Sequence, residues 1–266
     1  QIHANARHAH QRKFGMEIVS VVLISTRTPL CEDIVLFINE FMRFERLSDD
    51  NFREAVNLWF ESSEVCKFKF GHISDWDTSS VTSMMEAFQN RTQFNEDISR
   101  WDVSKVTDMS LMFFEAESFN GQIGRWDVSE VRDFNCMFLG ASSFDGDVSG
   151  WDVGNAVALA GMFWKASRFK GDLSGWNVSR ARSMDGMFSE APLFNCDLSR
   201  WDVSNVTSMA YMFCDSRSFD SDISKWEVGK VESMTKMFEG ATSFKREYVR
   251  EWKYKSNELR KKMFGE

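Results

Sequence analysis

The sequence predicts an α/β protein: a parallel β/α solenoid of seven 25-residue repeats with a helical cap at each end. Tryptophan returns every 25 residues without insertion or deletion, at Trp76, Trp101, Trp126, Trp151, Trp176, Trp201 and Trp226. Apolar residues recur at fixed places in each repeat, and the flanking segments have helical spacing. A period of this length is typical of a protein that stacks one structural unit on the next.

Each repeat is expected to begin with a short strand. If the tryptophan is position 1, the apolar residues around it occupy positions 23, 1 and 3, as in Ile98, Trp101 and Val103. Trp101 and Val103 alternate with polar residues, which is the two-residue period of a strand. Strands of successive repeats would then pair in parallel.

A helix of two or three turns is expected to follow the strand. Positions 9, 12, 13 and 16 are mostly apolar, and a spacing of i, i+3, i+4 and i+7 places them on one face of a helix. A small polar residue at position 7 or 8, such as Thr107, suits an N-cap. The position-13 phenylalanines should stack as a buried ladder, and the phenylalanine at position 19 should turn inward to close the repeat. The ladder residues are Phe113, Phe138, Phe163, Phe188 and Phe213.

Four segments are expected along the chain. Residues 1–27 form a flexible N-terminal tail with a short apolar strand, and residues 28–75 form an N-terminal cap of two amphipathic helices. Residues 76–250 form the repeat array, and residues 251–266 form a basic C-terminal capping helix. Caps are expected because the ends of a repeat array would otherwise expose apolar surface.

The strand-helix-loop unit resembles a leucine-rich repeat, with Ile98-x-x-Trp101-x-Val103 in the place of Leu-x-x-Leu-x-Leu. The motif Trp-Asp-Val-Ser-x-Val-x-x-Met-x-x-Met-Phe resembles the BspA-like leucine-rich-repeat surface proteins, as found in mycoplasma lipoproteins and in algal and bacterial proteins. The resemblance covers about two thirds of the chain. It implies a scaffold for adhesion or protein–protein interaction, without known catalysis and often at a cell surface.

A second resemblance suggests an alternative function. Residues 28–42, Thr-Pro-Leu-Cys-Glu-Asp-Ile-Val-Leu-Phe-Ile-Asn-Glu-Phe-Met, are similar to the start of an F-box. An F-box would make the protein an adaptor that recruits substrates to a ubiquitin ligase.

Neither catalysis nor nucleic-acid binding is expected. The net charge of −8 disfavours nucleic acid as the partner, because phosphate binding depends on clustered Lys and Arg. The sequence contains no nucleophile elbow, phosphate-binding glycine loop or zinc-protease motif, so we expect no enzyme, cofactor or metal. Rows of aspartate recur at positions 2 and 22. We expect these to form ion pairs and turn caps, with calcium binding as the alternative.

The cellular location is left open. Five cysteines occupy no repeating position, which favours a reduced, intracellular protein, whereas the family resemblance favours the cell surface. A protein partner is expected. The basic C-terminal helix could also contact a membrane, but a solvated cap is the simpler interpretation.

The candidate partner-binding residues are Leu111, Phe114, Leu139 and Trp164. Phe114, Leu139 and Trp164 occupy position 14 of three consecutive repeats, so they should form one apolar strip on the helical side, with Leu111 at its edge. An exposed apolar patch of this kind usually marks an interface. The alternative is that position 14 packs half buried against the return loop. Gly150 and Gly175 leave a smoother area on the strand side, and either face could bind.

Overall fold

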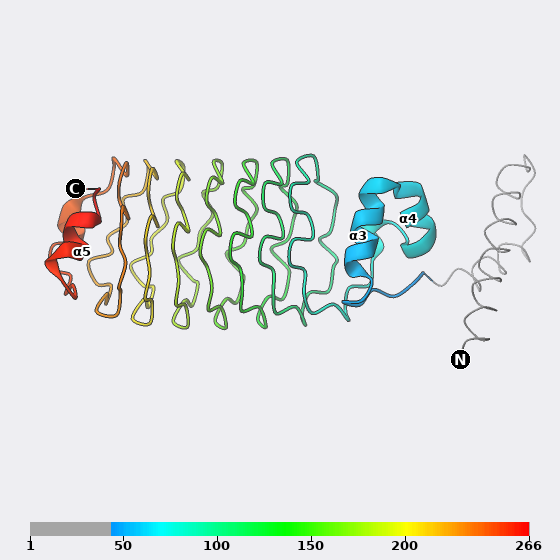
Figure 1. Ribbon diagram of the computed structural model, residues 1–266, viewed down its shortest axis with the longest axis horizontal. Coiled ribbons are helices and arrows are strands. Elements are labelled where there is room, and N and C mark those ends of the chain that lie inside the picture. Colours follow the sequence, from blue (N-terminus) through cyan, green and yellow to red (C-terminus); the bar gives the residue numbers. More distant parts are fainter. Residues whose placement is uncertain (1–43, 266) are drawn as a thin grey trace, which may run out of the picture. The chain divides into compact units, whose positions relative to one another are not determined.

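The computed structural model describes residues 44–265 of the chain. Figure 1 shows a stack of chain turns that follows helices α3 and α4 and ends at helix α5. Helix α3 spans Phe52–Glu61, α4 spans Ser63–Phe70 and α5 spans Asn257–Lys262, while 3-10 turns η1 and η2 span Ile73–Asp75 and Arg246–Val249. The expected tail and strand of residues 1–27, the F-box-like segment 28–42 and the first part of the N-terminal cap lie outside the described residues.

The predicted fold class is wrong. Within residues 44–265 the repeats contain neither an α-helix nor a strand, so they are not the β/α units of a leucine-rich-repeat-like solenoid. Each repeat is a series of turns joined by irregular chain. Neighbouring repeats meet at single parallel bridges between their position-8 residues: Ser83–Asp108, Asp108–Asp133, Asp133–Ala158, Ala158–Ser183, Ser183–Ser208 and Ser208–Ser233.

The expected helix does not form because alternate backbone N–H groups bond to the next repeat. In the second repeat the N–H groups at positions 9, 11, 13 and 15 donate to carbonyls at positions 8, 10, 12 and 14 of the third, at 2.7–2.9 Å. Residues at positions 11 and 15 have φ between +53° and +73° in every repeat. A right-handed helix needs negative φ throughout, so these residues interrupt it.

Three overlapping turns replace the helix, and they explain why the spacing was misleading. Position 12 donates its N–H to the carbonyl of position 9, position 14 to position 11, and position 16 to position 13, as at Met112, Phe114 and Ala116. These turns place positions 9, 12, 13 and 16 in the interior, as a helix would. Glycine and asparagine tolerate the left-handed conformation best, and five left-handed positions carry them: Asn90, Gly140, Gly161, Gly186 and Gly240.

The expected strand is also replaced by turns. One turn closes when the Trp101 N–H donates to the Ile98 carbonyl, and the next when the Val106 N–H donates to the Val103 carbonyl. Only Asp102 lies between them, which is too little chain for a strand. Trp101 and Val103 still point inward and are 3% and 2% exposed.

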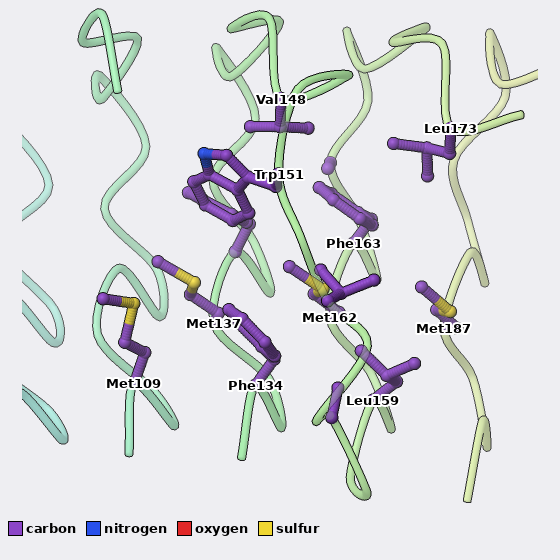
Figure 2. Packing of buried hydrophobic residues seen from close by; sticks show 14 of the residues in the cluster. Met109, Phe134, Met137, Val148, Trp151, Leu159, Met162, Phe163, Leu173 and Met187 are labelled. Atoms are coloured by element: carbon purple, nitrogen blue, oxygen red, sulfur yellow. The ribbon is translucent and has the colours of Figure 1, made fainter. Parts of the chain in front are cut away.

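Aromatic rings fill the interior, and the predicted phenylalanine ladder is confirmed. The position-13 rings from Phe113 to Phe213 are fully buried and stack on one another with centroids 5.5–5.8 Å apart. Each also stacks on the position-19 ring of its own repeat at 3.8–4.0 Å. Figure 2 shows side chains of successive repeats, including Trp151 and Phe163, packed in one continuous core. Each interior tryptophan also donates its indole N–H to a carbonyl 28 residues earlier.

The C-terminal segment closes the last repeat. The N–H groups of Lys236 and Phe238 donate to the carbonyls of Lys262 and Met263 at 2.7 and 2.9 Å. Phe264 stacks on Phe238 with centroids 5.7 Å apart, so the segment supplies both an aromatic ring and the hydrogen-bond acceptors of a further repeat. Helix α5 falls inside residues 251–266, where a basic capping helix is expected.

Replacing Phe163 with alanine should lower the free energy of unfolding by about 3–5 kcal/mol, because the ring has buried neighbours on both sides and would leave a cavity. Its stacking partners are Phe138, Phe169 and Phe188. Urea unfolding of the variant would measure the loss. Tyr211→Ala, at a side chain 41% exposed, is the control and should cost far less. Equal losses in the two variants would contradict the ladder.

Candidate functional site

The four candidate residues lie on the turns that replace the expected helix. Phe114, Leu139 and Trp164 each end the turn between positions 11 and 14, and all three are half buried, as is Leu111. The N–H of position 15 in one repeat donates to the carbonyl of position 14 in the next, so the three residues follow one another at the spacing of the repeats. We call Leu111, Phe114, Leu139 and Trp164 the apolar row.

Two side chains of the row, Leu139 and Trp164, lie against the glycine at position 11 of the following repeat. The Trp164 ring lies 3.3 Å from the point where a Cβ atom of Gly186 would stand, and Leu139 Cδ1 lies 3.7 Å from the same point at Gly161. The glycines make this close approach possible. Ser189 is buried at position 14 of the next repeat, and the row ends there.

Charged groups border Trp164. Its indole N–H donates to Glu190 Oε1 at 3.0 Å, and the Lys165 ammonium lies 6.0 Å from the ring centroid. The ring is half buried, beside Gly186 and with its indole N–H bonded to Glu190.

Other exposed apolar side chains lie outside the row. Tyr211 is 41% exposed at position 11, the position that Leu111 occupies in the second repeat. Sequence analysis missed it, although its place in the repeat matches Leu111. Val157 and Leu193 are 41% and 51% exposed at other positions and form no row. On the other proposed face, Gly175 has open space where a side chain would stand.

The aspartate rows cap turns. At position 2, Asp102 accepts from the N–H and the hydroxyl of Ser104 at 3.0 and 2.6 Å. At position 22, Asp147 accepts from the N–H and the hydroxyl of Ser149 at 3.0 and 2.7 Å. These bonds occupy the carboxylates locally. Within residues 44–265 no group of three or more His, Cys, Asp or Glu side chains is placed to hold a metal ion.

The expected ion pairs form only in part. Arg100 at position 25 pairs with Asp75 of the preceding position 25 at 3.4 Å. The other basic residues at position 25, expected as partners of the aspartates, are Arg125, Arg200 and Lys225, and among the described residues they form no ion pair. The cation that lowers the pKa of Asp102, after its serine hydrogen bonds, is Lys105 at position 5. Hydrogen bonds from serine are the largest cause that lowers the pKa of Asp97, Asp197 and Asp222. The nearby charges of Arg100, Arg200 and Lys225 lower the same pKa values to a smaller extent.

The described cysteines are free, and their environments do not favour a nucleophile. Burial raises the pKa of the thiols of Cys66, Cys196 and Cys214 to about 11, so they stay protonated at neutral pH. A cysteine nucleophile reacts as the thiolate. Among residues 44–265, no helix has the length and apolar character needed to cross a membrane.

The serine caps predict how stability depends on pH. They lower the pKa of Asp202 because its carboxylate accepts from the hydroxyl and N–H of Ser204. The same cause lowers the pKa of Asp77, Asp97, Asp102, Asp147, Asp172, Asp197 and Asp222. An aspartate whose pKa is lower in the folded than in the unfolded protein stabilises the fold at pH values above its unfolded-state pKa, about 3.9. This stabilisation is lost as the pH falls through its folded-state pKa.

The variant Asp202→Asn removes the charge of one carboxylate and keeps an acceptor for the turn. Asparagine is compatible with position 2, because Asn177 occupies it in the fifth repeat and its Oδ1 accepts a hydrogen bond from the Ser179 N–H at 3.2 Å. At neutral pH the variant should be less stable by up to about 1 kcal/mol, because the site is exposed. Denaturant unfolding between neutral pH and about pH 3 should show this difference shrinking on acidification. A difference that grows on acidification would contradict the capping role.

Comparison with known proteins places the chain in a family. No curated protein and no solved structure matches the chain. The family described as "Mycoplasma protein of unknown function, DUF285" matches residues 54–176 and 157–266, which include all seven repeats and the apolar row. Together the two matches cover far more than half of the chain, and the protein is a member of this repeat family.

Proposed function

We propose that the protein is a non-enzymatic scaffold that binds another protein through the apolar row. The observation that carries the proposal is the row itself. Across the seven repeats position 14 reads Gln89, Phe114, Leu139, Trp164, Ser189, Cys214 and Glu239, so large apolar side chains gather in three consecutive repeats and nowhere else at this position. The side chains are half buried, which leaves apolar surface for a partner.

The setting of the row suits protein recognition. Its backbone is held by hydrogen bonds to neighbouring repeats, so binding would order little additional chain. Tryptophan is the residue most often found to dominate binding energy at interfaces. Charged groups of Lys165 and Glu190 border the Trp164 ring, and interfaces commonly surround an apolar centre with a polar rim.

The BspA-like resemblance supports the same class of function. Membership in that branch would make the partner an adhesion ligand and the cell surface the place of binding. The alternative function, a ubiquitin-ligase adaptor, depends on residues 28–42, which lie outside the described residues. For α5 we favour capping over membrane contact, because Lys262 and Met263 accept hydrogen bonds from the last repeat.

The test is capture of partners from an extract of the source cells, followed by binding measurements with the purified partner. Trp164→Glu should weaken binding at least tenfold, about 1.4 kcal/mol, because it replaces the largest apolar side chain of the row with a charge beside Glu190. Its free energy of unfolding should fall by less than about 2 kcal/mol, since the ring is only half buried. Leu193→Glu, at a side chain 51% exposed, is the matched control and should bind normally.

Two results would count against the row. If Trp164→Glu unfolds the protein as severely as a core phenylalanine change does, the ring is a packing residue. If a partner binds Trp164→Glu and Leu139→Glu as tightly as the original protein, the interface lies elsewhere. Loss of binding only on changes within residues 28–42 would favour the adaptor function.

A further inference from the structure

The first repeat lacks a preceding repeat, and the N-terminal helix α3 replaces only part of it. Between neighbouring repeats, carbonyls at positions 8, 10, 12 and 14 accept from N–H groups of the repeat before. In the first repeat these carbonyls belong to Ser83, Met85, Ala87 and Gln89. They form an edge of acceptors on the side where α3 packs.

Three side chains of the cap stand in for groups of the missing repeat. The Asp49 carboxylate accepts from the Thr82 N–H at 2.7 Å, where inner repeats use the carbonyl of position 7. The Arg53 guanidinium donates to the Met85 carbonyl at 3.0 Å, where inner repeats use the N–H of position 11. The Phe60 ring meets Phe88 and Phe94 edge-on, with centroids 6.3 and 5.9 Å away, in place of the preceding phenylalanines.

Three acceptors are left without a partner. Among residues 44–265 no donor reaches the carbonyl oxygens of Ser83, Ala87 or Gln89. All three residues line a groove of about 290 Å³ that opens between α3 and the first repeat. The cap therefore replaces the donor for Met85 and leaves the donors for Ser83, Ala87 and Gln89 missing.

The first repeat departs from the others at this groove. Ala87 stands where the other six repeats have methionine, and Arg91 stands where they have alanine or serine. The smaller side chain leaves space, and Arg91 turns to α3, where it donates to Asn57 at 3.2 Å and lies over Phe60. These substitutions keep the groove from being filled by the core.

The chemistry of the groove favours a neutral main chain over an ion. Its charged side chains are Asp49, Glu86, Arg53 and Arg91, two of each sign. Asp49 and Arg53 are engaged by the first repeat, Glu86 by Arg53 at 3.4 Å, and Arg91 by Asn57. The carbonyls of Ser83, Ala87 and Gln89 remain without a donor among residues 44–265. Those of Ala87 and Gln89, two residues apart, are spaced for alternate N–H groups of a peptide.

We propose that this groove binds a short peptide segment of a partner protein, whose main-chain N–H groups donate to the carbonyl oxygens of Ala87 and Gln89. The segment would complete the hydrogen-bond pattern of the missing repeat, as a peptide completes the open edge of a sheet. The site lies in the first repeat and the apolar row in the second to fourth, so either site can fail without the other.

The probe is the blocked tetrapeptide acetyl-Gly-Ser-Gly-Ala-amide. Its four residues correspond to positions 13–16 of a repeat. Glycine replaces the phenylalanine of position 13, because Phe60 already fills the space of that ring. The N–H groups of the two glycines, at positions 13 and 15, are the proposed donors. The matched control peptide carries N-methylglycine at both glycine positions, which removes the donors. Carbonyl carbon chemical shifts of the full chain, recorded by NMR with millimolar peptide, report on the acceptors directly.

The carbonyl signals of Ala87 and Gln89 should shift with the probe, and the N-methylated peptide should bind at least tenfold more weakly. Asn57→Phe fills the groove from α3 and should abolish the shifts, whereas Glu61→Phe, on the same helix but outside the groove, should retain them. Unchanged carbonyl signals, equal binding by the two peptides, or shifts that persist in Asn57→Phe would each overturn the proposal. Shifts at Leu139 and Trp164 alone would assign the peptide to the apolar row and overturn it as well.

Discussion

The structure depends on one interaction: alternate N–H groups of each repeat donate to carbonyls of the next. At positions 9, 11, 13 and 15 these bonds point along the stack, whereas an α-helix would use the same groups within its own segment. The left-handed residues at positions 11 and 15 are the conformational cost, about 1 kcal/mol or more for each non-glycine residue. Stacked phenylalanines and tryptophans offset that cost by burying large apolar area in every repeat.

The same interaction gives the two ends of the stack different chemistry. The last repeat presents N–H donors, and the C-terminal segment meets those of Lys236 and Phe238 with two carbonyls. The first repeat presents carbonyl acceptors, and α3 meets only part of them, through Arg53. An unsatisfied backbone edge is a natural place for another chain to bind. We therefore propose two different modes of recognition, one at the groove beside Ala87 and one at the apolar row.

The sequence predicted the period, the aromatic ladder and the need for caps, because burial alone decides which positions are apolar. It did not distinguish a helix from consecutive turns, since Met109, Met112, Phe113 and Ala116 face inward in both. The glycines at some of positions 11 and 15 could have indicated left-handed backbone there. However, Leu111, Cys136 and Tyr211 adopt the same left-handed conformation although they are not glycine. Whether the segment forms a helix or consecutive turns depends on hydrogen bonds between residues about 24 apart in the sequence, and local sequence patterns do not reveal these bonds.

The position-14 residues of the apolar row, Phe114, Leu139 and Trp164, could be predicted from the sequence alone. Their surroundings could not, because these depend on how Leu139 and Trp164 meet Gly161 and Gly186. The most direct test of the account is the hydrogen-bond partner of the Phe163 N–H, measured as a scalar coupling across the hydrogen bond by NMR. The expected coupling is to the carbonyl of Met187 in the next repeat, 2.9 Å from the nitrogen. A coupling to the carbonyl of Leu159, four residues earlier, would show a helix and contradict it.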